Sequence, residues 1–131
     1  MNSKVALIIG AGTSLGSSIT KVFADDNFTV VPARREGEKL KPLEEEINSK
    51  GGKCFSFSLD ARKEDEVKNF IERVELEIGE IEIAIYNIGA NIKYNLTETS
   101  SKKYFKVWEM ATFGAFLMGR EVAKNMIKRK R

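Results

Sequence analysis

The chain has 131 residues, 42% of them hydrophobic and 31% charged, with a formal net charge of +3 at pH 7. This composition is typical of one globular domain. It contains no histidine and a single cysteine, Cys54, so neither a metal site nor an intrachain disulfide is expected. No apolar run reaches membrane-spanning length and the first residues lack a secretory pattern, which together with the lone thiol predicts a cytoplasmic protein without membrane contact. The basic residues near the end are interpreted as a solvated helix end rather than a nucleic-acid tail.

The first predicted element is a strand, and a glycine-rich turn and a helix follow it. Residues 5–9 are an unbroken apolar run, typical of a strand buried on both faces. In the next stretch, Gly10 permits a tight turn, Gly12 leaves room for a diphosphate, and Gly16 lets the helix pack closely. The helix N-terminus offers free N–H groups to phosphates. The predicted inner face of this helix consists of Leu15, Ile19, Val22 and Phe23. A glycine-rich junction without a ligand is the alternative.

Residues 28–31 predict a second strand, which should end at Pro32 because proline cannot donate to a sheet ladder. An acidic residue at this strand end would bind both ribose hydroxyls of NAD, but the position is Ala33. Arg34 and Arg35 follow, and a guanidinium pairs well with a 2′-phosphate. The sequence therefore favours NADP, with NAD as the weaker candidate. The alternative is a pair of solvated arginines at a helix start.

Helices and strands continue to alternate along the rest of the chain. The pattern predicts a helix with Leu40, Leu43 and Ile47 inward, a strand over residues 54–59, a helix with Val67, Phe70, Ile71, Val74 and Ile78 inward, a strand over residues 81–85, and a last helix from Ser100 or Ser101. Phe105 and Trp108 are interpreted as packing residues of this last helix, with an exposed aromatic patch for a partner as the alternative. Four such alternations predict an α/β, Rossmann-like, doubly wound parallel sheet. With strands numbered along the chain, the expected order is 3-2-1-4, and the ligand should bind at the carboxyl ends of strands 1 and 4.

These residues resemble the short-chain dehydrogenase/reductase family. Its glycine motif is similar to Gly10-Ala-Gly-Thr-Ser-Leu-Gly16, its adenine-contacting aspartate to Asp60, and its Asn-Ala-Gly stretch to Asn87-Ile-Gly89. The resemblance covers essentially the whole chain and implies one partial NAD(P)-binding domain over residues 1–131. The cofactor-binding residues that the residues and the resemblance together suggest are Gly10, Gly12, Thr13, Ser14, Leu15, Gly16, Arg34, Arg35, Asp60, Ala61, Asn87 and Gly89. The alternatives are an N-cap role for Asp60 and a plain strand-end turn at residues 87–89.

The sequence departs from the family pattern in three places. Ser14 replaces a glycine, and because a non-glycine residue avoids positive φ we expect a turn of different shape there. Ala111 stands where the family has a structural asparagine. No tyrosine is followed four positions later by lysine, so no catalytic residue is assigned, and the family's serine, tyrosine and lysine would lie beyond residue 131. A truncated gene, a fragmentary gene model or a pseudo-enzyme would all produce this pattern.

The resemblance implies an NADP(H)-dependent oxidoreductase that transfers hydride between a nicotinamide and a small alcohol or carbonyl substrate. It also implies a homo-oligomer, because the last helix lies at a dimer interface in many family members and residues 81–85 would form an unpaired sheet edge. The alternative is a non-catalytic nucleotide-binding fragment. A methyltransferase-like domain is disfavoured because no acidic residue follows the second strand.

Overall fold

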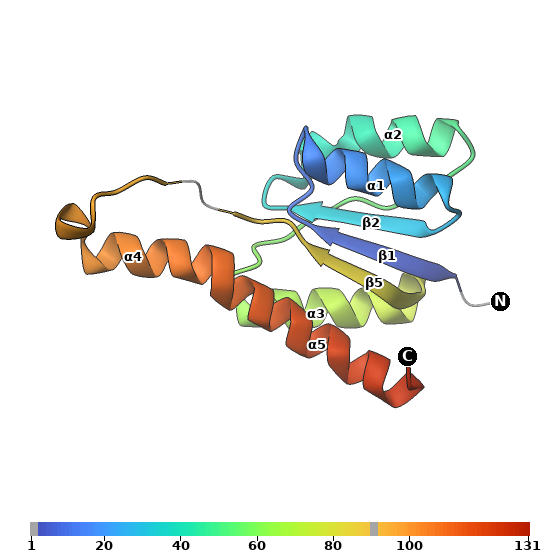
Figure 1. The fold of residues 1–131 in the computed structure, drawn as a ribbon. Helices are drawn as coiled ribbons and strands as arrows, with labels where there is room; N and C mark the ends of the chain where they lie inside the picture. The colour runs from blue at the N-terminus through green and yellow to red at the C-terminus, as the bar shows by residue number, and fades with distance from the viewer. Residues whose placement is uncertain (1–2, 90–91) are drawn as a thin grey trace.

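A parallel sheet with helices on both faces forms the centre of the chain in the computed structural model, which describes residues 3–89 and 92–131 (Figure 1). The strands are β1 (Lys4–Ile9), β2 (Thr29–Arg34), β3 (Lys53–Cys54), β4 (Phe57–Ser58) and β5 (Glu80–Tyr86). Their order is β3-β2-β1-β5, and β4 also pairs with β2. All pairings are parallel. The predicted fold class and order are therefore confirmed, with the third predicted strand divided into β3 and β4.

Pro32 lies inside β2, so the prediction that this strand ends before the proline is wrong. On one side Pro32 stays in register with Ile8 of β1. On the other side the carbonyls of Val30 and Arg34 accept bonds from the N–H groups of Phe55 and Leu59, at 3.1 and 2.9 Å. Backbone polar groups alternate along a strand, so residue 32 faces the same side as residues 30 and 34. The gap between β3 and β4 faces Pro32, which has no backbone N–H to donate. This explains why the third predicted strand is divided into β3 and β4.

Two helical layers cover the sheet. Helices α1 (Leu15–Asp25) and α2 (Lys41–Ser49) lie on one face, and a 3₁₀ turn over Gly37–Leu40 leads into α2. The other face carries α3 (Glu64–Arg73), which continues as a π-helical turn over Val74–Ile78, and α5 (Gly114–Arg129). Side chains of β1 alternate between the two apolar cores: Val5, Leu7 and Ile9 join one cluster, and Ala6 and Ile8 join the other. Each fully buried aliphatic side chain stabilises the fold by about 1.5–3 kcal/mol.

Helix α1 does not use the whole apolar face that its sequence pattern predicts. Leu15 and Val22 are exposed, with exposed fractions of 60% and 59%, while Gly16 and Thr20 are buried. The Thr20 hydroxyl donates to the Gly16 carbonyl at 2.8 Å, which satisfies this polar group inside the helix. Small residues therefore bring α1 close to the sheet, a contact that hydrophobic periodicity does not detect.

The last helix begins as predicted but turns a different face inward. Helix α4 (Ser101–Trp108) is capped by Ser100, whose hydroxyl accepts the Lys103 N–H at 3.2 Å. A π-helical segment (Glu109–Phe113) then joins α4 to α5. Phe105 and Trp108 have exposed fractions of 62% and 43%, so the prediction that they pack in the core is wrong. The inward residues instead lie on α5, at Gly114, Leu117, Met118 and Val122. The wider π turn shifts the helical phase, and α4 extends beyond the sheet (Figure 1).

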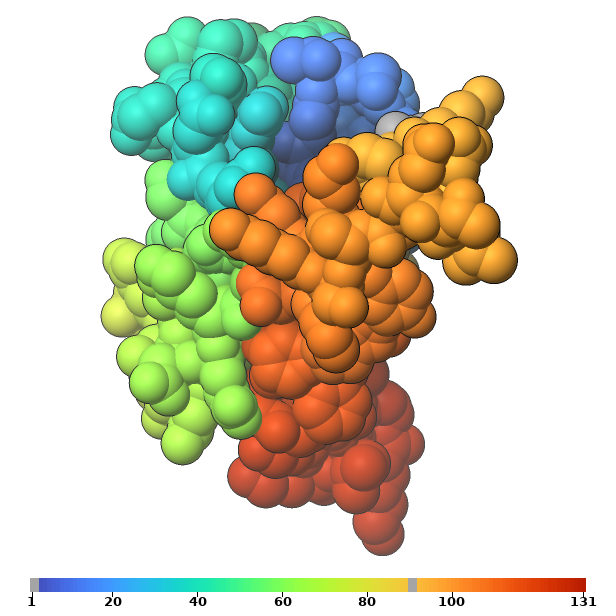
Figure 2. All heavy atoms as spheres, turned by 90° about the vertical axis from the view of Figure 1, so that its left-hand side faces the viewer, coloured from blue at the N-terminus to red at the C-terminus, as the bar shows by residue number. Residues whose placement is uncertain are grey.

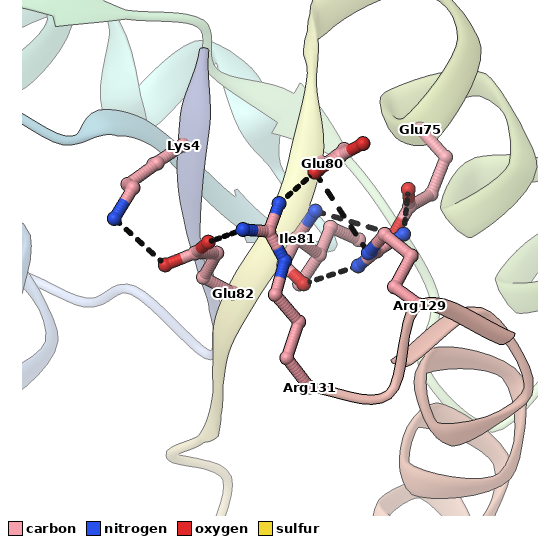
Figure 3. A network of polar contacts seen from close by, with 7 residues as sticks. All are labelled: Lys4, Glu75, Glu80, Ile81, Glu82, Arg129 and Arg131. Carbon is pink, nitrogen blue, oxygen red and sulfur yellow. Dashed lines mark hydrogen bonds and ion pairs between the residues drawn. The ribbon is translucent and has the colours of Figure 1, made fainter. Parts of the chain in front are cut away.

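A network of ion pairs ties the end of α5 to the amino end of the sheet (Figure 3). Arg129 donates to the Glu75 carboxylate at 2.7 Å and to the Ile81 carbonyl at 2.7 Å. Arg131 pairs with Glu80 and, at 3.2 Å, with Glu82. Because β5 pairs only with β1 among the described strands, these contacts attach the last helix to an edge strand, as the sequence predicts for residues 81–85. Within the described ranges, none of the helices has the length and apolar character needed to cross a membrane.

Candidate functional site

A cleft opens at the carboxyl ends of the parallel strands, with a cavity volume of about 200 Å³. The turn after β1, the end of β2, the loop after β4, the end of β5 and the π-helical segment all contribute to it. Its lining residues are Gly10, Ala11, Gly12, Arg34, Arg35, Glu36, Leu59, Asp60, Ala61, Arg62, Tyr86, Ile88 and Met110. Figure 2 faces this end of the molecule, with the cyan segment after β2, the green loop after β4 and the orange helix α4 around it. The location agrees with the rule that open α/β sheets bind ligands outside the carboxyl ends of their strands.

The glycine turn after β1 has the geometry that its sequence predicts. Gly10 adopts φ +90, and a Cβ atom there would lie 2.4 Å from the Asn87 carbonyl oxygen. A Cβ on Gly16 would lie 2.6 Å from the Ala11 Cα atom, so the helix packs closely against the turn. A Cβ on Gly12 would meet no protein atom within 4 Å. Packing therefore explains Gly10 and Gly16, whereas the open space at Gly12 fits the approach of a ligand.

The first turn of α1 presents exposed backbone beside this cleft. Ser14 has φ −118, which confirms that the turn avoids a positive φ at the position where the family has glycine. Thr13, Ser14 and Leu15 are all exposed, and the Ser14 side chain makes no capping hydrogen bond. The N–H groups of the first turn have no partner within the helix, so they are oriented to bind an anion.

Arg34 and Arg35 line the cleft without a side-chain partner. Among residues 3–89 and 92–131, neither guanidinium makes a hydrogen bond or an ion pair. The adjacent acid, Glu36, is engaged instead by Lys39, with an Nζ–Oε2 distance of 2.6 Å. That contact, helped by the field of the two arginines, lowers the pKa of Glu36. The end of β2 therefore carries two guanidinium groups that have no hydrogen-bond or ion-pair partner among the described residues, with Glu36 as a nearby acid.

Asp60 is held by a neighbouring arginine. The Arg62 Nε and Nη2 atoms donate to the two carboxylate oxygens at 2.9 and 2.8 Å, and the Arg62 backbone N–H donates to Oδ1 at 3.1 Å. The Arg62 guanidinium lowers the pKa of Asp60 to about 2. The N-cap of α3 is Lys63 and it has no side-chain capping bond, so the alternative in which Asp60 caps this helix is wrong. The next residue, Ala61, is buried and lines the cleft.

Asn87 joins the end of β5 to the end of β1. Its backbone N–H donates to the Ile9 carbonyl at 2.8 Å, and its side-chain amide donates to the Gly10 carbonyl at 3.3 Å. This pair of contacts is more specific than a plain strand-end turn. Gly89 is exposed, and a Cβ there would meet no protein atom within 4 Å. Of the predicted residues, the cleft lining contains Gly10, Gly12, Arg34, Arg35, Asp60 and Ala61. The other six are not among the lining residues, namely Thr13, Ser14, Leu15, Gly16, Asn87 and Gly89.

The sequence analysis did not assign every residue that lines the cleft, and those it missed include Arg62, Tyr86 and Met110. The Tyr86 hydroxyl donates to the Met110 carbonyl at 2.5 Å, and burial raises the pKa of Tyr86 to about 12. A Cβ on Gly114 would lie 2.2 Å from the Tyr86 hydroxyl oxygen, so this glycine lets the helix approach the cleft. Only Arg62 leaves a local signal, as a basic residue two positions after a strand-end acid. Tyr86 and Met110 leave no such signal, because their contact depends on the position of the π-helical segment.

Comparison with known proteins places the chain beside one group of enzymes. The family model of short chain dehydrogenases matches residues 4–131. A short chain dehydrogenase of Pseudocercospora fijiensis is 29% identical over 132 residues, which cover 99% of this chain and 43% of the relative. The chain spans about half the length of the curated relatives it matches.

Solved structures give the same result. A short-chain dehydrogenase from Rhodopseudomonas palustris superposes with a TM-score of 0.91 and 43% identity, covering 96% of this chain and 59% of that one. A metagenomic short-chain oxidoreductase in complex with NADP superposes with a TM-score of 0.93 and 25% identity, covering 100% of this chain and 60% of that one.

Proposed function

The chain belongs to the short-chain dehydrogenase family, and from this premise we propose that its cleft binds NADP(H) and serves hydride transfer between the nicotinamide and an alcohol or carbonyl substrate. The observation that carries the proposal is the pair of guanidinium groups of Arg34 and Arg35, which have no hydrogen-bond or ion-pair partner among the described residues and lie in the same cleft as the open turn at Gly12. The combination fits a cofactor with a diphosphate and a separate third phosphate.

The preference for NADP over NAD rests on the end of β2. Ala33 is buried there and offers no carboxylate to the ribose hydroxyls of NAD. A guanidinium–phosphate contact is a charge-assisted hydrogen bond that contributes about 1.5–3 kcal/mol. Such a contact corresponds to a roughly tenfold to hundredfold preference for NADP. The similar metagenomic oxidoreductase in complex with NADP supports the same assignment.

Each part of the cofactor has candidate residues in the cleft or in the chain segments that border it. The glycine turn and the first turn of α1 would bind the diphosphate, and Arg34 and Arg35 would bind the 2′-phosphate. Asp60 and Ala61 would contact the adenine, and Asn87 and Gly89 would border the nicotinamide ribose. When bound, the nicotinamide supplies or accepts the hydride. The chain's own residues bind and orient the cofactor.

The reacting oxygen of the substrate also needs a proton donor or acceptor. Tyr86 is unsuited to this role, because its hydroxyl is engaged by the Met110 carbonyl and its pKa is raised to about 12. None of the three tyrosines is followed four positions later by a lysine. These two observations favour a second candidate function, nucleotide binding without catalytic turnover by these residues.

Calorimetric titration with NADPH, NADH and S-adenosylmethionine tests the cofactor assignment. We expect heat of binding with NADPH, weaker binding with NADH and none with S-adenosylmethionine. Absence of NADPH binding would contradict the proposal. NADPH oxidation with a panel of aldehydes and ketones then separates the two candidates: turnover supports the oxidoreductase, and binding without turnover supports the nucleotide-binding module.

We further propose that the chain associates with a second copy of itself through an exposed aromatic face. Trp108 stacks on Phe113 with a centroid distance of 5.7 Å, and Phe113 stacks on Phe116 at 6.3 Å. Trp108 and Phe116 are exposed, as is Phe105, three positions before Trp108 in the same helix, while Phe113 is partly buried against the core. A contiguous aromatic surface of this kind is typical of interaction sites. Sedimentation should show a dimer or larger assembly that W108K shifts towards the monomer, whereas a wild-type monomer at tens of micromolar would contradict this.

A further inference from the structure

Three arginines line the cleft, and they differ in what they contact. Arg34 and Arg35 have no partner within the part of the chain that the structure describes, whereas Arg62 contacts acids on both sides of the opening. Its guanidinium donates two hydrogen bonds to the Asp60 carboxylate, in the loop after β4. Its Nε atom also lies 3.9 Å from the Glu109 carboxylate, in the π-helical segment. Arg62 therefore links two walls of the cleft that are far apart in the sequence.

The hydrogen bonds of Asp60 leave it little freedom. Its Oδ1 atom accepts two donors, the backbone N–H and the Nε of Arg62, and its Oδ2 atom accepts Nη2. A carboxylate oxygen has about two acceptor positions, so Oδ1 is fully engaged and Oδ2 keeps one. The side chain is also largely covered, with an exposed fraction of 16%. The carboxylate thus presents a single remaining acceptor in a fixed orientation.

The charge of Asp60 would otherwise oppose the binding of an anion. A dinucleotide brings at least two phosphate charges into a cleft whose partly excluded water screens them poorly. An ionised carboxylate in the same cleft repels those charges unless a cation compensates it. Arg62 is the described side chain that forms an ion pair with Asp60.

We propose that Arg62 is a positioning residue for cofactor binding, which neutralises Asp60, directs its remaining acceptor towards the adenine amino group and holds the loop after β4 against the helix at Glu109. This inference rests on the proposed NADP(H) function. Because NADPH and NADH share the adenine, Arg62 acts on both cofactors equally. Arg34 differs, because its proposed contact exists only in NADPH.

The test compares three variants by calorimetric titration with NADPH and with NADH. R62Q should weaken both cofactors to the same extent, by about tenfold, the size of one charge-assisted hydrogen bond. The double variant D60N/R62Q should bind both cofactors more tightly than R62Q, because an asparagine keeps an acceptor oxygen and removes the uncompensated charge. It should bind them more weakly than wild type, because Arg62 no longer orients that acceptor. R62K should lie between R62Q and wild type, because an ammonium group supplies the charge but not the planar fork.

Carboxyl NMR supplies a readout that does not depend on the cofactor. In the R62Q variant the pKa of Asp60 should rise from about 2 towards its ordinary value of 3.8. Circular dichroism establishes whether each variant is folded, and if R62Q does not fold, R62K carries the same test. Equal loss for both cofactors in R62K supports the proposal, and no loss or loss confined to NADPH overturns it.

Other outcomes also decide the matter. Unchanged binding in R62Q overturns the proposal. A double variant as weak as R62Q overturns the role of Arg62 in neutralising Asp60, because removal of the carboxylate charge should restore part of the affinity. If wild type binds NADPH but the variants give one of these contradicting results, only the proposed role of Arg62 is wrong and the proposed NADP(H) function stands. If wild type binds neither cofactor, the proposed function fails with it.

Discussion

Arginines stand at both ends of the sheet, and their surroundings differ. At the amino end, Arg129 and Arg131 contact three glutamates and one strand carbonyl (Figure 3). At the carboxyl end, Arg34 and Arg35 border an open cleft and have no partner among the described residues. The same side chain therefore serves structure at one end and is available to a ligand at the other.

The difference follows from what each environment does to the charge. Arg129 and Glu75 are mostly covered, with exposed side-chain fractions of 18% and 12%, so each needs the other. Arg34 and Arg35 are adjacent like charges, and the nearby acid Glu36 forms its ion pair with Lys39, so the two arginines contribute little to the stability of the free protein. Side chains of this kind are typical of binding sites, where stability is lower because the ligand completes the contacts. The comparison predicts that mutations of the arginines at the amino end lower the stability of the fold, whereas mutations of Arg34 and Arg35 weaken cofactor binding.

The largest expected effect is on stability at the amino end. R129A removes one partner of a covered ion pair and the donor to the Ile81 carbonyl, and should lower the free energy of unfolding by about 3 kcal/mol. Urea titration measures this loss. NADPH affinity of the folded fraction should stay unchanged, because the network lies at the opposite end of the sheet from the cleft.

R131A is the matched control at the same end. Its side chain is half exposed and its ion pairs are of the surface kind, so the loss should be below about 1 kcal/mol. Equal losses in R129A and R131A would show that burial does not distinguish the two arginines.

A smaller effect on stability is expected at low pH, and it comes from the ion pair between Asp60 and Arg62 in the cleft. The pKa of Asp60 is lowered from 3.8 to about 2 by Arg62, so the ionised pair stabilises the fold above pH 4. This contribution, about 2 kcal/mol, is lost as the pH falls from about 4 to about 2. D60N lacks it at every pH, so urea titrations of wild type and D60N should converge in acid. A constant difference between them down to pH 2 would rule out the lowered pKa.

The third effect is on binding alone. R34A should weaken NADPH by about 1.5 kcal/mol or more, the low end of a charge-assisted bond, and leave NADH nearly unchanged. Because the Arg34 side chain makes no hydrogen bond or ion pair with the residues that the structure describes, the free energy of unfolding should change by less than about 0.5 kcal/mol. Calorimetry and urea titration measure the two quantities, with R131A as an arginine control. Equal weakening of NADPH and NADH would contradict a 2′-phosphate role.

The smallest effect is that of salt on wild type. Arg35 is exposed and Arg34 half-buried, so their attraction for a phosphate is screened at high ionic strength. The preference for NADPH should shrink when NaCl is raised from about 0.05 to about 0.5 M, where the screening length falls well below 10 Å. A preference independent of salt would point to a contact other than these two arginines.

The sequence predicts the parts of this molecule that depend on local pattern. The apolar run of β1, the turn at Gly10 and the position of Arg34 and Arg35 at the end of β2 follow from neighbouring residues. The parallel sheet and its strand order follow from the alternation of strands and helices along the chain. Pro32 was misinterpreted because its effect depends on which neighbouring strand its missing N–H faces. Phe105 and Trp108 were misplaced because a single π turn changes the phase of a helix without altering its apolar pattern. Arg62 was missed because its importance lies in the contacts with Asp60 and Glu109, which only the fold brings together.

The most direct test of the account is a cofactor comparison across the pair of unpaired arginines. The dissociation constants of NADPH and NADH are measured in one buffer for wild type and for the double variant R34A/R35A. We expect wild type to bind NADPH at least about tenfold more tightly than NADH, and the double variant to bind the two cofactors almost equally. Equal affinities in wild type, or a preference for NADPH that survives in R34A/R35A, would contradict the claim that these arginines bind the 2′-phosphate.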